Sequence, residues 1–271
     1  MDNKTIEIVQ QKQFEILIDI DRICKKLGTQ YFLCCGTLLG TIRHKGAIPW
    51  DDDLDVGFLR EDYEKFIDGA EKELDMRFFL QTWHSDECYA LPHCKIRDKY
   101  SHYIETANKF SGCADGISVD VLPFDNVPNG KLLRYLHGIT LYNILNVIKV
   151  KRRWTFIEND RVGFLKKCIY VLVAKLSNDK DLIRLYERLV ITFNRKDNMV
   201  FVSDTAGLDY FRFVEKRSRY IDLTKGEYRG IMFSIPKEYD AILSNSYGNY
   251  MCLPPFEDRV GQPGIESVEI F

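Results

Sequence analysis

Residues 36–66 read GTLLGTIRHKGAIPWDDDLDVGFLREDYEKF, and their central feature is the acidic run at residues 51–55. Four carboxylates within five residues repel one another, so a folded chain tolerates them best where cations neutralise the charge. Leu54, Val56 and Phe58 alternate with the acids, as expected of a strand with one apolar and one acidic face. We therefore predict that this run enters a strand inside the domain.

Asp53 and Asp55 are the first candidates for a metal-binding pair. Residues two apart on a strand leave the same face. Mg²⁺, or Mn²⁺ in its place, accepts two such hard oxygen ligands while substrate phosphates and water complete its shell. A bare pair of aspartates with this spacing is common by chance, and a solvated acidic turn is the plain alternative. The alternating apolar residues favour the metal site.

Gly36 and Thr37 stand between a predicted strand at 31–35 and a short predicted helix. Glycine lets the backbone approach a phosphate, and the N-terminus of the following helix offers free N–H groups. Arg43, in the same stretch, could hold a phosphate through two parallel hydrogen bonds, or could belong to a basic surface turn. We predict a phosphate-binding turn here.

A third carboxylate is expected from a later strand, and Asp120 supplies it within the β-prone run 117–122. An acid there is costly unless a metal neutralises it, although an edge strand facing solvent would also accommodate it. Lys95 and Arg97 lie two apart on another predicted strand, so they share a face that could contact donor phosphates. Together these features outline the palm of a nucleotidyltransferase.

Secondary-structure signals indicate an α/β (α+β) fold, in which a mixed central sheet is flanked by helices and interrupted by a helical insertion. We predict a catalytic core at 1–130, a helical subdomain with three helices at 131–200, and a segment that completes the core at 201–271. The first helix should end at Gly28, and Pro236 should begin a late helix. The tail from Pro254 is expected to wrap the surface.

Composition limits the function classes. A net charge of −2 gives no sign of non-specific nucleic-acid binding. The chain has eight cysteines without a CxxC pair, no apolar leader at its N-terminus, and no apolar run long enough to span a membrane. We expect a cytoplasmic protein with reduced, mostly buried thiols. A zinc site is not favoured, because no standard spacing fits its candidate ligands, His84, Cys88, His93 and Cys94.

The stretch 36–66 resembles the signature of the LicD/fukutin family of nucleotidyltransferase-fold phosphotransferases. The resemblance continues in KIRDKYSHYIE from Lys95, in GISVDVLPFDNVP from Gly116 and in IPKEYDAILSNSYGNYMCLPP from Ile235. One departure lies in the tail, where the family pattern leads us to expect an arginine followed closely by a histidine. This chain instead has Arg259 and then Gln262.

The resemblance implies a transferase that moves a phospho-alcohol group, above all phosphocholine, from a CDP-linked donor to a sugar hydroxyl, with release of CMP. The acceptor would be a glycan or a lipid-linked glycan, as in the modification of lipopolysaccharide or teichoic acid. Asp53, Asp55 and Asp120 would be the metal-binding acids. Alternatives are a DxD glycosyltransferase that uses a nucleotide sugar, and a glycan-binding member of the fold without catalysis.

The helical middle is strongly basic. Ten lysines and arginines but only two acids lie between Lys131 and Lys175. A helical subdomain with a solvated basic face is the plain reading. The alternative is peripheral docking on the inner face of an anionic membrane through residues 149–153 and 161–167, because each basic residue near such a surface contributes about 1 kcal/mol.

Overall fold

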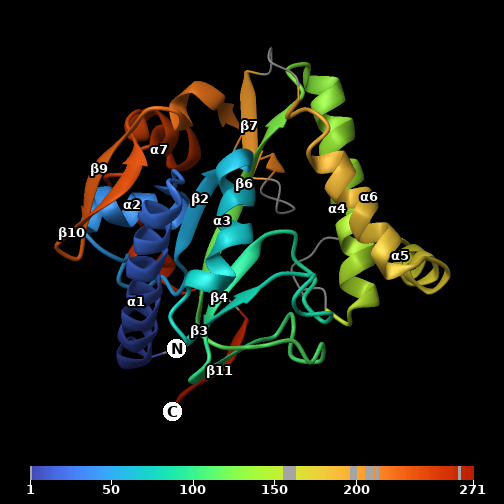
Figure 1. Ribbon diagram of the computed structural model, residues 1–271, viewed down its shortest axis with the longest axis horizontal. Helices are drawn as coiled ribbons and strands as arrows, with labels where there is room; N and C mark the ends of the chain where they lie inside the picture. Colours follow the sequence, from blue (N-terminus) through green and yellow to red (C-terminus); the bar gives the residue numbers. More distant parts are fainter. Residues whose placement is uncertain (1, 155–162, 196–199, 205–209, 212–213, 262–263) are drawn as a thin grey trace.

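A mixed sheet forms the centre of the computed structural model (Figure 1). Its strand order is β1-β2-β6-β4-β3, and β7 adds to β6 and β8 to β7. The strands are β1 (Phe32–Leu33), β2 (Asp55–Leu59), β3 (Phe78–Gln81), β4 (Cys94–Asp98), β6 (Ser118–Val127), β7 (Phe201–Asp204) and β8 (Glu215–Lys216). The structure describes residues 2–154, 163–195, 200–204, 210–211, 214–261 and 264–271. The fold is thus mixed α/β with a central sheet, as predicted.

Helices α1 (Asn3–Leu27) and α3 (Arg60–Glu73) pack against each other and against the sheet (Figure 1). Phe58 of β2 meets Phe66 of α3 with ring centroids 4.9 Å apart, so the apolar side of the acidic strand is buried under this helix. The predicted end of α1 is confirmed. Gly28 takes the left-handed conformation (φ 65°) and its N–H bonds the carbonyl of Cys24.

A second group of elements lies beside α2 (Cys35–His44) and consists of the hairpin β9 (Leu223–Tyr228) and β10 (Ile231–Pro236) together with α7 (Tyr239–Tyr247). The prediction that Pro236 begins a helix is wrong, because it ends β10 opposite Leu223. Proline lacks an N–H donor, which a strand end tolerates as well as a helix start does. The helix begins three residues later.

The described residues between 131 and 194 form three helices, the number predicted: α4 (Lys131–Lys151), α5 (Phe164–Leu176) and α6 (Asp179–Val190). They have an apolar core of their own, in which Leu145 and Tyr186 meet Trp83 and Tyr89 from the loop between β3 and β4. The helical region therefore packs on this loop, at the side of the sheet (Figure 1). Residues 201–204 return to the sheet beside β6, while the predicted domain boundaries stay predictions.

The C-terminal tail, which was expected to wrap the surface, contains a strand that pairs with another strand. Its strand β11 (Ile265–Ile270) pairs antiparallel with β5 (Ser101–Glu105). The expectation of mostly buried thiols holds for Cys24, Cys34 and Cys94, whereas Cys168 and Cys252 are exposed. None of the helices that the structure describes combines the length and the apolar character needed to cross a membrane.

Candidate active site

The sheet register brings three charged residues side by side. In the parallel pairing of β2 with β6, Asp55 lies opposite Asp120, and in the antiparallel pairing of β6 with β4, Asp120 lies opposite Lys95. Residues opposite each other on neighbouring strands point to the same face. Lys95 Nζ lies 2.9 Å from Asp120 Oδ1. Two of the predicted acids and one predicted cation therefore share one sheet face.

Gly36 and Thr37 form the first turn of α2 and contact the acidic run in two different ways. A Cβ on Gly36 would lie 2.8 Å from Asp51 Oδ2 and 4.0 Å from Asp53 Oδ1, so a side chain there would displace the Asp51 carboxylate. The buried Thr37 hydroxyl accepts a hydrogen bond from the backbone N–H of Asp55 (2.8 Å) and fixes the start of β2. Their contacts with phosphate stay predictions.

The carboxylates differ in how their surroundings shift their pKa values. Burial, the Asp51 carboxylate and the charge of Asp120 raise the pKa of Asp53 well above its normal value. Burial would also raise the pKa of Asp120, but Lys95 and His93 outweigh it and the pKa is lowered. The pKa of Asp53 is therefore higher in the folded than in the unfolded protein. As pH rises above the pKa of the unfolded state, ionisation of Asp53 destabilises the metal-free folded protein. A cation beside Asp53 would remove that cost.

The same two acids line a cavity of about 140 Å³ together with Asp52, Lys95 and Tyr103. Among the described residues no three histidine, cysteine or acidic side chains come close enough to hold a metal ion by themselves. Mg²⁺ in phosphate-transferring sites usually keeps one or two carboxylates and takes its other ligands from substrate and water. The carboxylates that line this cavity fit such a shared site. Coordination of the metal ion by all three predicted acids stays a prediction.

The sequence analysis missed the residues that hold the acidic run in place. Gln10 Nε2 of α1 donates to the carbonyls of Ile48 (2.9 Å) and Asp51 (2.7 Å). Gln13 Nε2, one turn later, donates to the carbonyl of Asp52 (2.8 Å). The Tyr103 hydroxyl donates to Asp52 Oδ2 (3.0 Å). Buried glutamines on an otherwise apolar helix face were the available signal, since a buried amide needs a partner.

The two predicted arginines serve other contacts. Arg43 sits in the last turn of α2, at the end away from Gly36, and donates to the carbonyl of Tyr250 (2.8 Å). Arg97 is only 1% exposed and donates to Gln81 Oε1 (2.5 Å) and to the carbonyl of Gly116 (2.6 Å). Both arginines therefore brace the fold, and a contact of either with donor phosphate stays a prediction.

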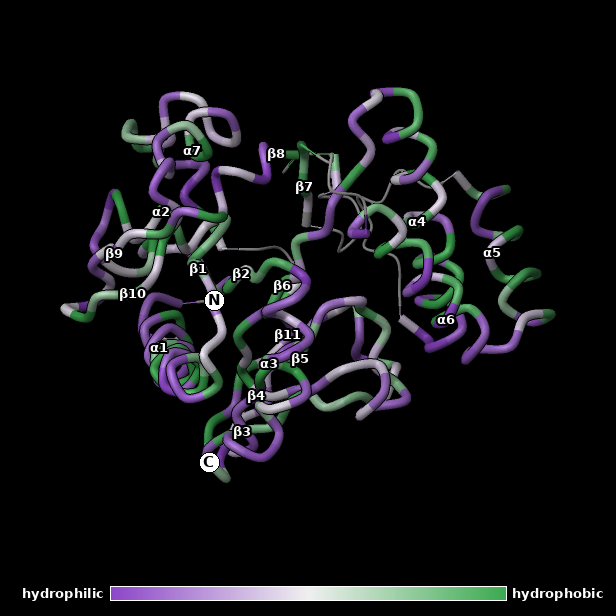
Figure 2. The backbone as a smooth tube through the Cα atoms, turned by 45° about the horizontal axis from the view of Figure 1, so that its top comes forward, coloured by the Kyte–Doolittle hydropathy of each residue, from purple (hydrophilic) through white to green (hydrophobic). Residues whose placement is uncertain are grey.

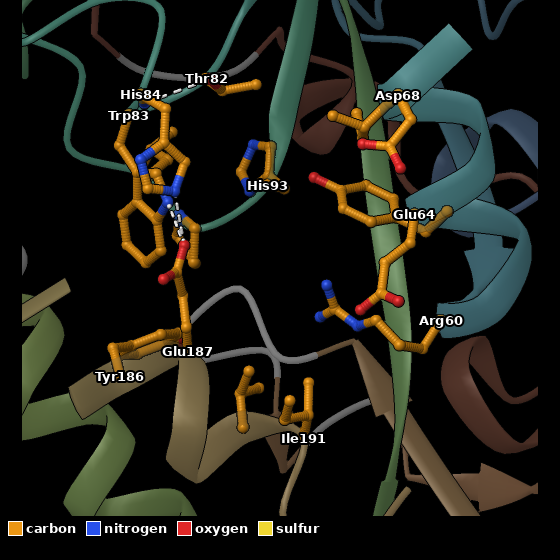
Figure 3. Close-up of a pocket in the computed structure, with 15 residues that line it drawn as sticks. Arg60, Glu64, Asp68, Thr82, Trp83, His84, His93, Tyr186, Glu187 and Ile191 are labelled. Carbon is orange, nitrogen blue, oxygen red and sulfur yellow. Dashed lines mark hydrogen bonds and ion pairs between the residues drawn. The ribbon is translucent and has the colours of Figure 1, made fainter. Parts of the chain in front are cut away.

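A second cavity of about 400 Å³ lies next to the carboxylates, between α3, α6 and the loop from Thr82 to His93 (Figure 3). His93 joins the two sites, because it lines this cavity while its Nε2 lies 3.2 Å from Asp120 Oδ2. Among the described residues no hydrogen-bond partner faces the other ring nitrogen, Nδ1, although His93 is only 7% exposed. The sequence analysis had considered His93 only as a zinc ligand, which its spacing did not favour.

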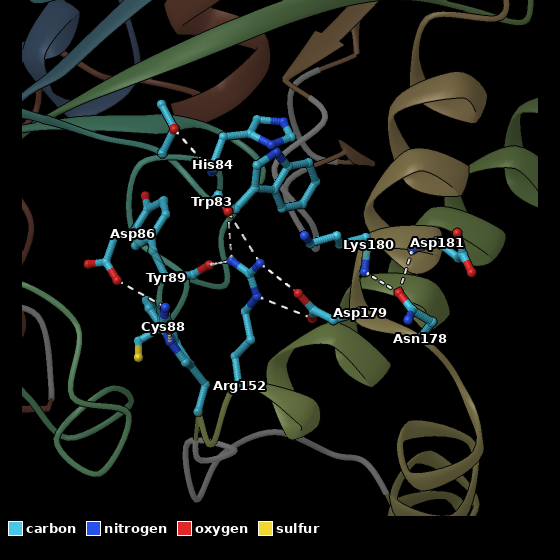
Figure 4. A network of polar contacts seen from close by, with 12 residues as sticks. Trp83, His84, Asp86, Cys88, Tyr89, Arg152, Asn178, Asp179, Lys180 and Asp181 are labelled. Carbon is cyan, nitrogen blue, oxygen red and sulfur yellow. Dashed lines mark hydrogen bonds and ion pairs between the residues drawn. The ribbon is translucent and has the colours of Figure 1, made fainter.

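Arg152 corrects the prediction of a basic face at residues 149–153. It is 7% exposed and forms the centre of the network in Figure 4. Its guanidinium donates to Asp179 Oδ2 (2.8 Å) and to the carbonyls of Trp83 (3.2 Å) and Tyr89. Arg152 is therefore a buried tie between the helical region and the loop after β3. Arg161, another residue of the predicted basic face, lies outside the described residues, as does Gln262.

Known proteins resemble this chain both in part and over nearly its whole length. The family model for the nucleotidyltransferase domain of LicD/FKTN/FKRP matches residues 28–129. The chain is 28% identical to the lipopolysaccharide cholinephosphotransferase LicD of Haemophilus influenzae over 96% of each protein. It is also 43% identical to an uncharacterised protein of Rickettsia prowazekii, over 18% of each protein. Residues 28–129 therefore form a nucleotidyltransferase domain of the LicD/FKTN/FKRP family.

Proposed function

We propose that this LicD-type transferase moves phosphocholine from CDP-choline to a sugar hydroxyl of a cell-surface glycan or glycolipid precursor. The register of Asp55, Asp120 and Lys95 carries the proposal, because it concentrates charge where a diphosphate and a metal ion would meet. The choice of choline draws on the name of the Haemophilus relative, whose acceptor is lipopolysaccharide.

In the proposed reaction, the acceptor oxygen bonds to the phosphorus that bears choline, the bond from that phosphorus to the bridging oxygen breaks, and CMP leaves. Mg²⁺ or Mn²⁺ on Asp53 and Asp120, with Asp55 beside them, would neutralise the diphosphate. Lys95 holds Asp120 ionised and oriented. The lowered pKa makes Asp120 a weak base, so we assign it to binding the metal rather than to accepting the proton of the acceptor.

The N-terminus of α2 would supply a second anion contact. Its first turn lies beside the acidic run, and the absence of a side chain at Gly36 leaves the backbone open to approach. Free N–H groups and the positive end of the helix dipole stabilise phosphate at such a position. The donor diphosphate would thus lie between α2 and the sheet acids.

A donor screen tests the proposal. CDP-choline, CDP-ribitol and CDP-glycerol are each incubated with Mg²⁺ and a lipopolysaccharide or teichoic acid oligosaccharide, and CMP release is measured. We expect release from CDP-choline that depends on the acceptor. Turnover of a UDP- or GDP-sugar instead would favour the glycosyltransferase alternative, and glycan binding without turnover of any donor would favour the binding module.

We also propose that the protein contacts an anionic membrane through α5, where lipid-linked acceptors would be presented. Its outward side carries Phe164, Leu165, Leu172 and Leu176, which are 59–84% exposed. Figure 2 shows this helix at the edge of the molecule, away from the sheet. The helix has three lysines and no acid, a composition typical of interfacial helices. The contact thus moves from the predicted face at 149–153 to α5.

A further inference from the structure

The 400 Å³ cavity is lined by carboxylates and aromatic rings (Figure 3). Glu64 and Asp68 lie four residues apart on α3, and Glu187 reaches in from α6. Like charges at this helical spacing destabilise a helix. Among the described residues neither Glu64 nor Asp68 forms a salt bridge, although the charge of Glu64 interacts with that of Arg60. The single charge of Arg60 is also shared with Asp125, so the cavity carries an excess of negative charge.

The positive groups of the cavity are already engaged. Arg60 donates from Nε and Nη2 to both oxygens of the fully buried Asp125 (2.7 and 2.5 Å). His84 Nε2 lies 2.6 Å from Glu187 Oε1, and His93 faces Asp120. A phosphate or another anion would find no unpaired lysine or arginine here, so the charge balance favours a cation.

The aromatic part of the cavity suits a cation without N–H groups. Trp83 and Tyr186 pack edge to face with ring centroids 5.5 Å apart. Trp83 Nε1 donates to Glu187 Oε1 (3.1 Å), which holds a carboxylate next to the indole. Aromatic rings combined with carboxylates are the usual recognition site for quaternary ammonium groups, which no hydrogen bond can hold.

His93 connects this cavity to the proposed metal site. Its side chain points into the cavity in Figure 3, and its Nε2 is 3.2 Å from Asp120 Oδ2. The Nδ1 atom of this buried imidazole has no hydrogen-bond partner among the described residues, and a buried polar atom of this kind is expected to meet a polar ligand. A ligand with its phosphate beside Asp120 and a short cationic arm would pass His93 on its way into the cavity.

We infer that this cavity is the subsite for the trimethylammonium end of choline. The inference rests on the proposed function, because that function places the diphosphate of the donor beside Asp120. Binding of the cation in the cavity itself requires no turnover. Glu64, Asp68 and Glu187 supply the charge, and Trp83 and Tyr186 supply the aromatic rings. The cavity thus selects the alcohol of the donor, while the sheet acids act on its phosphates.

Binding of choline and of its neutral carbon isostere, 3,3-dimethylbutan-1-ol, tests the subsite in the full chain. Tryptophan fluorescence reports it, because Trp83 lines the cavity. We expect choline to bind about tenfold more tightly than the isostere, the ratio that a cation–π and charge contribution of about 1.4 kcal/mol gives. The double variant Glu64→Gln, Asp68→Asn should lose most of this preference.

Glu71→Gln is the matched control, since Glu71 is exposed on the same helix and does not line the cavity. It should keep the wild-type preference. Equal affinity for the two alcohols, no saturable choline binding, or an unchanged preference in the double variant would overturn the inference. Circular dichroism shows whether each variant is folded.

The two proposals fail in different ways. If choline binds selectively but no CDP-linked donor releases CMP, the subsite stands and the proposed transfer is wrong. If CMP is released from CDP-choline while choline and its isostere bind equally, the transfer stands and the subsite is wrong. Release at equal rates from CDP-choline and from the CDP ester of the isostere would also contradict the subsite.

Discussion

The central sheet and the helical region differ in which charged and apolar side chains they bury and which they expose. The sheet holds Asp55, Asp120 and Lys95 in register, with Asp55 and Lys95 buried and Asp120 half-buried, and sets the lysine against the acids. The helical region buries the polar tie Arg152 and exposes apolar side chains along α5. Charges held out of water cost energy unless an opposing charge or a ligand compensates them. The sheet is therefore organised for chemistry and the helices for packing and contact.

Replacing the acids at the start of β2, where Asp53 precedes the strand and Asp55 begins it, should have the largest effect. Asp53→Asn and Asp55→Asn should each lower kcat/KM by about 10³-fold, because a metal ion contributes several kcal/mol to charge stabilisation in the transition state. CMP release from CDP-choline measures this loss, and circular dichroism confirms the fold. Near-normal turnover of either variant at saturating Mg²⁺ would place the chemistry elsewhere.

Breaking the tie in the helical region should affect stability instead. Arg152→Ala leaves Asp179 and the carbonyl groups of Trp83 and Tyr89 without their donor, so we expect a loss of about 3 kcal/mol in unfolding free energy. Urea unfolding measures it. The neighbouring exposed residue gives the control, since Arg153→Ala should change stability by less than about 0.5 kcal/mol. Equal effects of the two variants would mean that the network contributes little.

The contrast also shows what the sequence can reveal. Alternating apolar residues around Asp55 and a β-prone run around Asp120 predicted two strands, and both are present, although β2 begins at Asp55 and leaves Asp53 outside it. Their pairing could not be predicted in the same way, because register depends on residues distant in the chain. Arg43, Arg97 and Arg152 show the same limit. A basic residue looks alike in sequence whether it contacts a phosphate, solvent or a buried carbonyl.

Some residues gave almost no local signal. Gln10 and Gln13 support backbone carbonyls nearly forty residues away, and His93 becomes notable only because the fold places it between Asp120 and the aromatic cavity. In the sequence, His93 was considered only as a zinc ligand, and its spacing did not favour that role. Such roles depend on tertiary contacts, which periodicity cannot encode.

Membrane contact should show a smaller effect that involves only the helical region. Lys167→Glu together with Lys175→Glu should weaken co-sedimentation with anionic vesicles by at least about fivefold for each charge removed, at about 1 kcal/mol per basic residue. CMP release with a soluble acceptor should stay unchanged. Binding should fade at high salt and be absent with neutral vesicles. If the wild type does not bind anionic vesicles at low salt, α5 has another partner.

Calorimetry with a non-reactive CDP-choline analogue, with a methylene group as the bridge between the two phosphorus atoms, tests the central claim most directly. The claim is that the sheet acids and the donor diphosphate together form the metal site. We predict tight binding only with Mg²⁺ present, and loss of this Mg²⁺ dependence in Asp53→Asn. Equal affinity with and without Mg²⁺ in the wild type, or unchanged Mg²⁺ dependence in the variant, would contradict the account.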